Sequence, residues 1–138
     1  MKELNIEAKR ENLDEVLAFV NEQLETCGCP MDIKIQIDIA VEEIFVNIAS
    51  YAYNPEIGTA VIRVELQEDP LSVIMTFMDH GMPYDPLAKE DPDVTLSADE
   101  REIGGLGIFM VKQSMDQVKY EYKNGQNILY VTKKLKKE

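Results

Sequence analysis

Three short segments hold the residues of this 138-residue chain whose types and spacing could carry chemistry. The first contains Glu43 and Asn47, four residues apart. In a helix, both side chains would project from one face, roughly 100 to 140° around from the apolar stripe. Two solvated polar residues on an amphipathic helix would give the same pattern. Asparagine is, however, a poor helix former because its amide competes with the backbone, so its place here hints at a further use.

The second segment follows a run of apolar residues and contains Asp79 and Gly81. Asp79 has the same alternation parity as Val73 and Phe77, so in a strand its carboxylate would lie on the buried side. A buried carboxylate needs a partner, and a glycine two residues later would let a ligand approach the backbone. A D-x-G turn at the end of a strand is common, so this motif alone does not indicate a ligand-binding site.

The third segment is a glycine cluster, Gly104, Gly105 and Gly107, which precedes or opens an apolar stretch. Free backbone N–H groups and the positive end of a helix dipole favour phosphate at such a place. Glycines before a helix can also serve packing alone. The chain has no G-x-x-x-x-G-K-[ST] sequence, so the cluster is not a Walker-type phosphate loop.

The elements that must position these segments can be predicted from hydrophobic periodicity and turn residues. The prediction is a strand around 4–8, a helix from 13 to about 26, a long helix over 32–53, antiparallel strands over 59–66 and 71–78, a helix over 106–115, and a hairpin over 118–130. Asn12 and Glu15 are expected to form a capping box, and Asn124-Gly125 a type I′ turn.

The long helix is the ambiguous element. Isoleucines at 33, 35, 37 and 39 alternate as in a strand, while Ile37, Val41, Ile44 and Ile48 repeat as in a helix. The length of the segment, its lack of glycine and the stop at 54–55 favour the helix.

Composition limits the class of protein. A formal net charge of −12 argues against a nucleic-acid surface, and no apolar stretch is long enough to span a membrane. We expect one domain in the cytoplasm, without a secretory signal. Cys27 and Cys29 are interpreted as reduced thiols, and the single His80 argues against histidine-rich metal sites. The polar, acidic segment 86–103 predicts either a functional lid or disorder.

Read in order, the three segments resemble the histidine-kinase-like ATPase superfamily, and within it the stand-alone anti-sigma-factor serine/threonine kinases. The matching stretches are VEEIFVNIASYAY (41–53), MDHGMPYDPLAK (78–89) and GGLGIFMVKQSMDQVKY (104–120). The resemblance runs nearly end to end. It implies an α/β fold of two layers: a mixed, mostly antiparallel sheet with helices on one face, in a single domain over 1–138 with an ATP lid at about 86–103.

The resemblance also implies a role for each candidate residue. Asn47 matches the asparagine whose side-chain oxygen binds Mg²⁺, and Glu43 matches the general base. Asp79 matches the aspartate that accepts a hydrogen bond from the adenine amino group, and Gly81 gives the base access to the backbone. The glycines that match those closing on the ATP phosphates are Gly104, Gly105 and Gly107.

Three further positions concern the surroundings of this site. Tyr51 stands where many kinase members have histidine, and Tyr130 stands where a threonine often lines the adenine pocket. Arg101 could reach a γ-phosphate or could be a solvated lid residue.

The function implied is phosphoryl transfer from Mg-ATP to a serine or threonine of an anti-anti-sigma protein. A sigma factor, sequestered by a homodimer, would be a second partner. The alternative from another class is a nucleotide-dependent regulatory binding module that phosphorylates nothing. A sensor histidine kinase fragment and a gyrase-like or chaperone ATPase fit less well, because the chain has no helical histidine segment and no room for a transducer domain.

Overall fold

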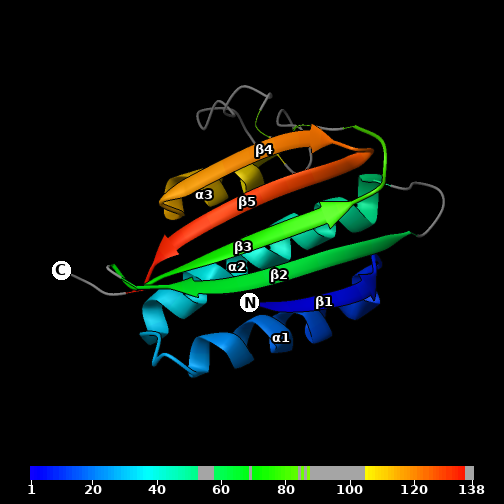
Figure 1. Cartoon of the computed structure of the whole chain (residues 1–138). Coiled ribbons are helices and arrows are strands. Elements are labelled where there is room, and N and C mark those ends of the chain that lie inside the picture. Colours follow the sequence, from blue (N-terminus) through cyan, green and yellow to red (C-terminus); the bar gives the residue numbers. More distant parts are fainter. Residues whose placement is uncertain (53–57, 69, 84, 86, 88–104, 136–138) are drawn as a thin grey trace.

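A five-stranded antiparallel sheet carries helices on one of its faces (Figure 1). The computed structural model describes residues 1–52, 58–68, 70–83, 85, 87 and 105–135. The strands are β1 (Lys2–Glu7), β2 (Thr59–Gln67), β3 (Ser72–Asp79), β4 (Gln117–Lys123) and β5 (Gln126–Lys134). The helices are α1 (Leu13–Glu25), α2 (Met31–Asn47) and α3 (Gly105–Ser114), with a 3₁₀ turn at Arg10–Asn12 and a π turn at Ile48–Ala52.

The strand order is β1-β2-β3-β5-β4, and each neighbouring pair is antiparallel. The predicted two-layer fold is therefore confirmed. The structure describes only Leu87 of the proposed lid at 86–103, and Gly104 lies outside the described residues as well. No helix in the described part of the chain is long and apolar enough to cross a membrane.

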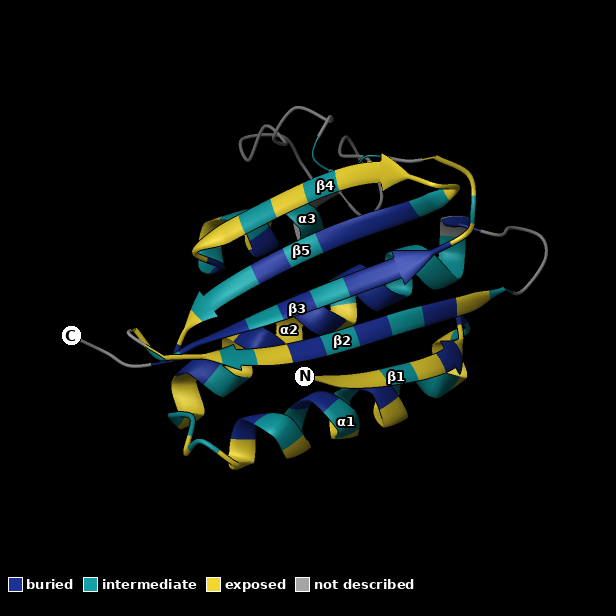
Figure 2. Ribbon diagram, viewed as in Figure 1, coloured by how far each residue is buried: buried dark blue, intermediate teal, exposed yellow. Residues whose placement is uncertain are grey.

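The core lies between the sheet and the helices, because alternate strand residues point to the helical side. Figure 2 shows how buried and less buried residues follow one another along the strands. On β3 these residues include Val73, Met75 and Phe77, all of which are at most 1% exposed. The opposite sheet face carries charged residues, and there Arg63 pairs with Glu3 at 2.6 Å. This alternation fixes which strand residues can reach a site on the helical side.

Helix α2 explains the ambiguous isoleucine pattern. Ile33 and Ile37 are buried against the sheet, whereas Ile35 and Ile39 are 51% and 42% exposed on the outer side of the same helix. The helix prediction is confirmed, and the strand-like alternation arises because α2 carries apolar residues on two sides. Helical structure continues to Ala52 through the π turn, and residue 53, the predicted end, is not among the described residues.

The capping box predicted at the start of α1 is wrong. Asn12 is the N-cap residue, but it makes no side-chain capping hydrogen bond. Its amide instead donates to the carbonyl oxygen of Glu7 at 3.0 Å, which ties the helix start to the end of β1. Its backbone angles, φ −93° and ψ 2°, also lie outside the extended region typical of a capping residue.

The hairpin of β4 and β5 forms as predicted. Asn124 and Gly125 have φ of 54° and 76°, as a type I′ turn requires. The register across the hairpin places Tyr122 opposite Asn127 and Tyr120 opposite Leu129. Cys27 and Cys29 are free thiols, as expected.

Candidate functional site

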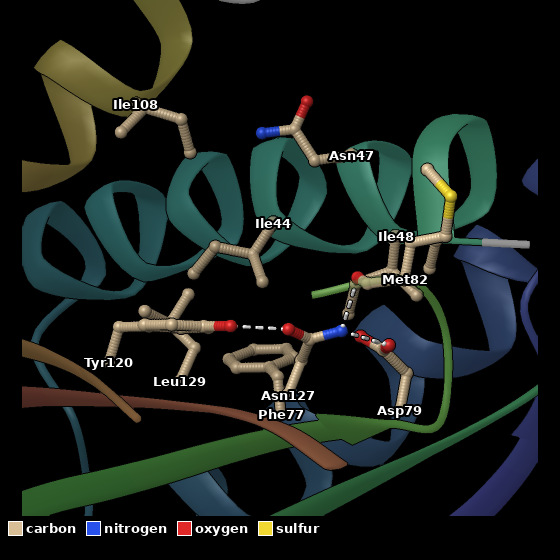
Figure 3. A pocket seen from close by; sticks show the side chains of 11 residues that line it. Ile44, Asn47, Ile48, Phe77, Asp79, Met82, Ile108, Tyr120, Asn127 and Leu129 are labelled. Carbon is tan, nitrogen blue, oxygen red and sulfur yellow. Dashed lines mark hydrogen bonds between the residues drawn. The ribbon is translucent and has the colours of Figure 1, made fainter. Parts of the chain in front are cut away.

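A pocket lies between α2 and the sheet, at the end where β3 finishes and β5 begins (Figure 3). The pocket, its mouth and the open solvent in front of it together have a volume of about 490 Å³. Most of its wall is apolar, with a few polar groups. It is lined by Ile44, Asn47, Ile48, Ala52, Phe77, Asp79, Met82, Ile108, Tyr120, Asn127 and Leu129.

Asp79 is the buried carboxylate of this pocket. It ends β3 and is 5% exposed, so its predicted position on the core side of the strand is correct. Its Oδ1 accepts hydrogen bonds from the backbone N–H of Gly81 and from Nδ2 of Asn127, both at 2.9 Å. No other described residue donates to the carboxylate. Oδ2 is therefore available to accept a hydrogen bond from a ligand that enters the pocket.

Gly81 has a packing role that can be read directly from its surroundings. A Cβ at this position would lie 2.6 Å from the carbonyl carbon of Ala52 and closer still to its oxygen, nearer than real contacts allow. The next residue, Met82, donates its backbone N–H to that same oxygen at 2.9 Å. The turn after β3 thus packs directly against the π turn at the end of α2, and only glycine permits this approach.

The two polar residues of α2 occupy different positions relative to the pocket. Asn47, the last residue of α2, lies in the pocket wall, and its amide has no partner among the described residues. Glu43 lies one helical turn earlier, roughly 5–6 Å away between Cβ atoms, and does not line the pocket. Partial burial raises the pKa of the Glu43 carboxyl above its ordinary value, and the negative charge of Glu42 raises it further.

Helix α3 brings its first turn to the same pocket. It begins at Gly105, contains Gly107, and contributes Ile108 to the pocket wall. At the other end of α3, Nζ of Lys133 donates to the carbonyl oxygen of Ser114 at 2.7 Å, a favourable place for a cation.

Asn127 and Tyr120 are pocket residues that the sequence reasoning missed. Asn127 is 7% exposed, and its Nδ2 donates to the carbonyl oxygen of Met82 at 2.8 Å as well as to Asp79. The Tyr120 hydroxyl donates to Oδ1 of Asn127. A signal was present, because Asn127 shares its parity with Leu129 and so is polar in an apolar alternation, as Asp79 is.

The expectation for Tyr130 is wrong. Val131 and Leu129, its neighbours, point into the helical side, so Tyr130 lies on the opposite face of the sheet. There its hydroxyl donates to Oε1 of Glu121 at 3.2 Å. The β5 residues that reach the pocket are Asn127 and Leu129. The side chain of Tyr51 and all of Arg101 are outside what the structure describes.

Comparison with known proteins shows to which family the chain belongs. Residues 6–133 match the family described as histidine kinase-like ATPase domain. The chain belongs to this family. Its relatives in the family include the serine-protein kinase RsbW of Halalkalibacterium halodurans, 30% identical over 140 residues that cover 99% of this chain and 84% of the relative. The RsbW of Staphylococcus aureus strain MSSA476 is 27% identical, with 99% and 87% covered.

Two further comparisons agree with the predicted family. The serine/threonine-protein kinase BtrW of Bordetella bronchiseptica is 27% identical over 100 residues, which are 72% of this chain and 70% of the relative. A crystal structure of the RsbU and RsbW domains of a Mycobacterium tuberculosis protein superposes with a TM-score of 0.69 at 18% identity. It covers all of this chain and 34% of that one, and it supports the histidine kinase-like ATPase fold. The names of the relatives agree with the expected enzyme class.

The donor groups of this histidine kinase-like ATPase domain fit a nucleotide and its magnesium ion. Mg²⁺ in nucleotide sites is usually bound by one or two protein carboxylates together with waters and phosphates, and Asn47 would supply a neutral amide oxygen in place of a carboxylate. Among the described residues, no group of three or more histidine, cysteine or acidic side chains could hold a metal by itself. The wall near Asp79 is apolar and suits a flat base with one amino group.

Proposed function

We propose that this domain binds Mg-ATP in the pocket and transfers the γ-phosphoryl group to a serine or threonine of a partner protein. By resemblance, the partner is an anti-anti-sigma protein, and a sigma factor held by a homodimer is a second partner. The observation that carries the proposal is the arrangement of Asp79 and Asn47. A buried carboxylate with one available oxygen and an amide without a partner among the described residues line the same apolar pocket.

Asp79 would recognise the adenine base of the nucleotide. Its Oδ2 would accept the hydrogen bond of the adenine 6-amino group, and Phe77 and Leu129 would pack against the base. Such a contact is selective, because a buried acceptor that meets a base without the amino donor stays unpaired.

We place the phosphates of the nucleotide beside Asn47 and the first turn of α3. Asn47 would hold the magnesium ion, which when bound neutralises phosphate charge and orients the γ-phosphate. The first turn of a helix offers backbone N–H groups and the positive end of the helix dipole, which favour phosphates. Gly104, Gly105 and Gly107 would let the backbone come close to the phosphate oxygens.

Glu43 would accept the proton of the attacking hydroxyl. The acceptor oxygen forms a bond to the γ-phosphorus, the bond from phosphorus to the bridging oxygen of ADP breaks, and the proton moves to the Glu43 carboxylate. A pKa raised by burial and by Glu42 strengthens Glu43 as a base. Its place one turn before Asn47 would set it near the phosphate end of the site.

Nucleotide binding is the first test. We expect the parent protein to bind Mg-ADP and Mg-ATP in calorimetry, and Asp79→Ala to lose binding because the amino group has no acceptor. Tyr130→Phe, which removes a hydroxyl on the opposite sheet face, should bind as the parent does. If folded Asp79→Ala binds normally, the site assignment is wrong.

Phosphoryl transfer is the second test. Glu43→Gln should keep nucleotide binding and lose about 10²- to 10⁴-fold in transfer of radiolabelled phosphate to the purified anti-anti-sigma proteins of the same organism.

One observation favours the alternative function of a nucleotide-dependent binding module. Glu43 does not line the pocket, so the described structure shows no contact between its carboxylate and the pocket that Asp79 and Asn47 share. If the parent binds ATP and an anti-anti-sigma protein but transfers no phosphate, the module is the correct function.

A further inference from the structure

The carboxamide of Asn127 connects three parts of the pocket wall (Figure 3). Its Nδ2 donates to Oδ1 of Asp79 at 2.9 Å and to the carbonyl oxygen of Met82 at 2.8 Å. Its Oδ1 accepts the hydroxyl hydrogen of Tyr120 from the neighbouring strand. Asn127 lies directly opposite Asp79 in the register of β3 and β5, so the backbone itself places the two side chains face to face.

These partners allow the amide of Asn127 only one orientation. Rotation of the amide by 180° would bring its oxygen against the Asp79 carboxylate and the Met82 carbonyl, three acceptors without a donor between them. The same rotation would turn an NH₂ group toward the hydroxyl of Tyr120. Asp79 and Met82 therefore select the orientation of the amide, and the hydrogen bond from the Tyr120 hydroxyl to Oδ1 helps to hold it there.

The fixed orientation of the Asn127 amide affects the Asp79 carboxylate. Its Oδ1 already accepts from Gly81 and from Asn127, which leaves Oδ2 as the oxygen that can accept from a ligand. We propose that Asn127 is a positioning residue for base recognition: it occupies Oδ1, turns Oδ2 toward the base, and is itself held with the help of Tyr120. This inference rests on the proposed function, because it assumes that adenine binds at Asp79.

The inference predicts a particular loss of selectivity. ADP presents a 6-amino donor to Oδ2, whereas IDP presents a 6-oxo acceptor at the same place. A correctly turned Oδ2 favours ADP over IDP. If Asn127 is removed, only the Gly81 N–H still donates to Oδ1, so the carboxylate is held less firmly and the preference should shrink even when the pocket keeps its shape. A residue that only fills space would affect the two nucleotides equally.

A pair of variants of equal shape separates the two roles. Asn127→Thr puts a hydroxyl donor, on a shorter side chain, at the position opposite Asp79 in the register, and Asn127→Val replaces that hydroxyl with a methyl group. We expect the ratio of ADP to IDP affinity, measured by calorimetry, to fall at least about tenfold in Asn127→Val and less than about threefold in Asn127→Thr, since a hydrogen bond to a charged group is worth about this much.

A second pair tests the part played by Tyr120. Tyr120→Phe should lower the ADP to IDP ratio by about two- to fivefold, because the amide keeps its donors but loses a partner that helps to hold its orientation. Tyr130→Phe is the matched control, since this tyrosine lies on the same hairpin and on the opposite sheet face. It should leave the ratio unchanged.

Each outcome bears on the inference. Equal ratios in folded Asn127→Val and Asn127→Thr would overturn it, and so would a loss of ADP and IDP affinity by the same factor. If the parent itself fails to bind ADP, the proposed function is wrong and the inference falls with it. If the parent binds ADP and Asn127→Val keeps the full preference, the proposed function stands and only the positioning role is rejected.

Discussion

Gly81→Ala is expected to damage the adenine end of the pocket while the sheet and its core stay in place. The new Cβ would lie 2.6 Å from the carbonyl carbon of Ala52 and closer still to its oxygen, where ordinary contact begins at 3.4 Å. The turn after β3 would have to retreat by about 1 Å, because backbone, not a flexible side chain, stands in the way. That movement would lengthen the bond from Met82 N–H to Ala52, now 2.9 Å.

The size of the effect follows from these contacts. Overpacking typically costs about 1–3 kcal/mol, and a lost hydrogen bond about 1 kcal/mol. Together they predict a decrease of about 2–4 kcal/mol in the free energy of unfolding. With a urea m value of about 2 kcal/mol/M, the unfolding midpoint should fall by about 1–2 M. Binding of ADP should weaken as well, because Gly81 N–H is one of the two donors to Asp79.

Urea unfolding and calorimetry with ADP would measure the two effects, with Gly125→Ala as the control. Gly125 has φ 76°, and no atom lies within 4 Å of the place that a Cβ would take, so alanine there adds backbone strain of about 1–2 kcal/mol without a clash. The control should bind ADP as the parent does. If Gly81→Ala unfolds at the same urea concentration as the parent and binds ADP equally, the argument from close packing is refuted.

Three further changes test the site and its support. Asn47→Ala should bind ADP with an affinity that no longer depends on magnesium, and calorimetry with and without the ion would show this; an unchanged dependence contradicts the metal role. Glu42→Gln should lower the raised pKa of Glu43, so that phosphoryl transfer, which needs the deprotonated base, persists to lower pH. If the acidic side of the pH–rate profile does not move, Glu43 is not the general base. Lys133→Met should lower the free energy of unfolding by about 1 kcal/mol, because the C-terminal carbonyl of α3 loses a charged donor. If Lys133→Met and the parent unfold at the same urea concentration, the Lys133 hydrogen bond does not stabilise the end of α3.

The sequence predicted those features that depend on local pattern. Helical spacing placed α2 correctly despite the alternating isoleucines, and the Asn124-Gly125 pair set the hairpin. Alternation along β3 placed Asp79 on the core side. Each of these follows from residues close together in the chain, whose periodicity survives folding.

What the sequence did not predict depends on contacts between distant segments. The π turn at Ile48–Ala52 presents the Ala52 carbonyl to Met82, thirty residues later, and no local pattern reports such a contact. Asn12 is not such a case: its amide donates to the Glu7 carbonyl, only five residues earlier, which competes with capping of α1. Tyr130 is a different case, because its parity beside Leu129 and Val131 already placed it away from the pocket.

The type I′ turn at Asn124-Gly125 has a consequence for how the protein tolerates change in length. Exposed turns usually accept insertions, because nothing packs against them. Here the turn joins the two strands that supply Tyr120 and Asn127, and its two-residue length keeps both side chains on the helical side of the sheet. One added residue would force a bulge or move Tyr120 to the open face. This surface turn, two residues before the pocket residue Asn127, is thus as constrained in length as the pocket wall is in chemistry.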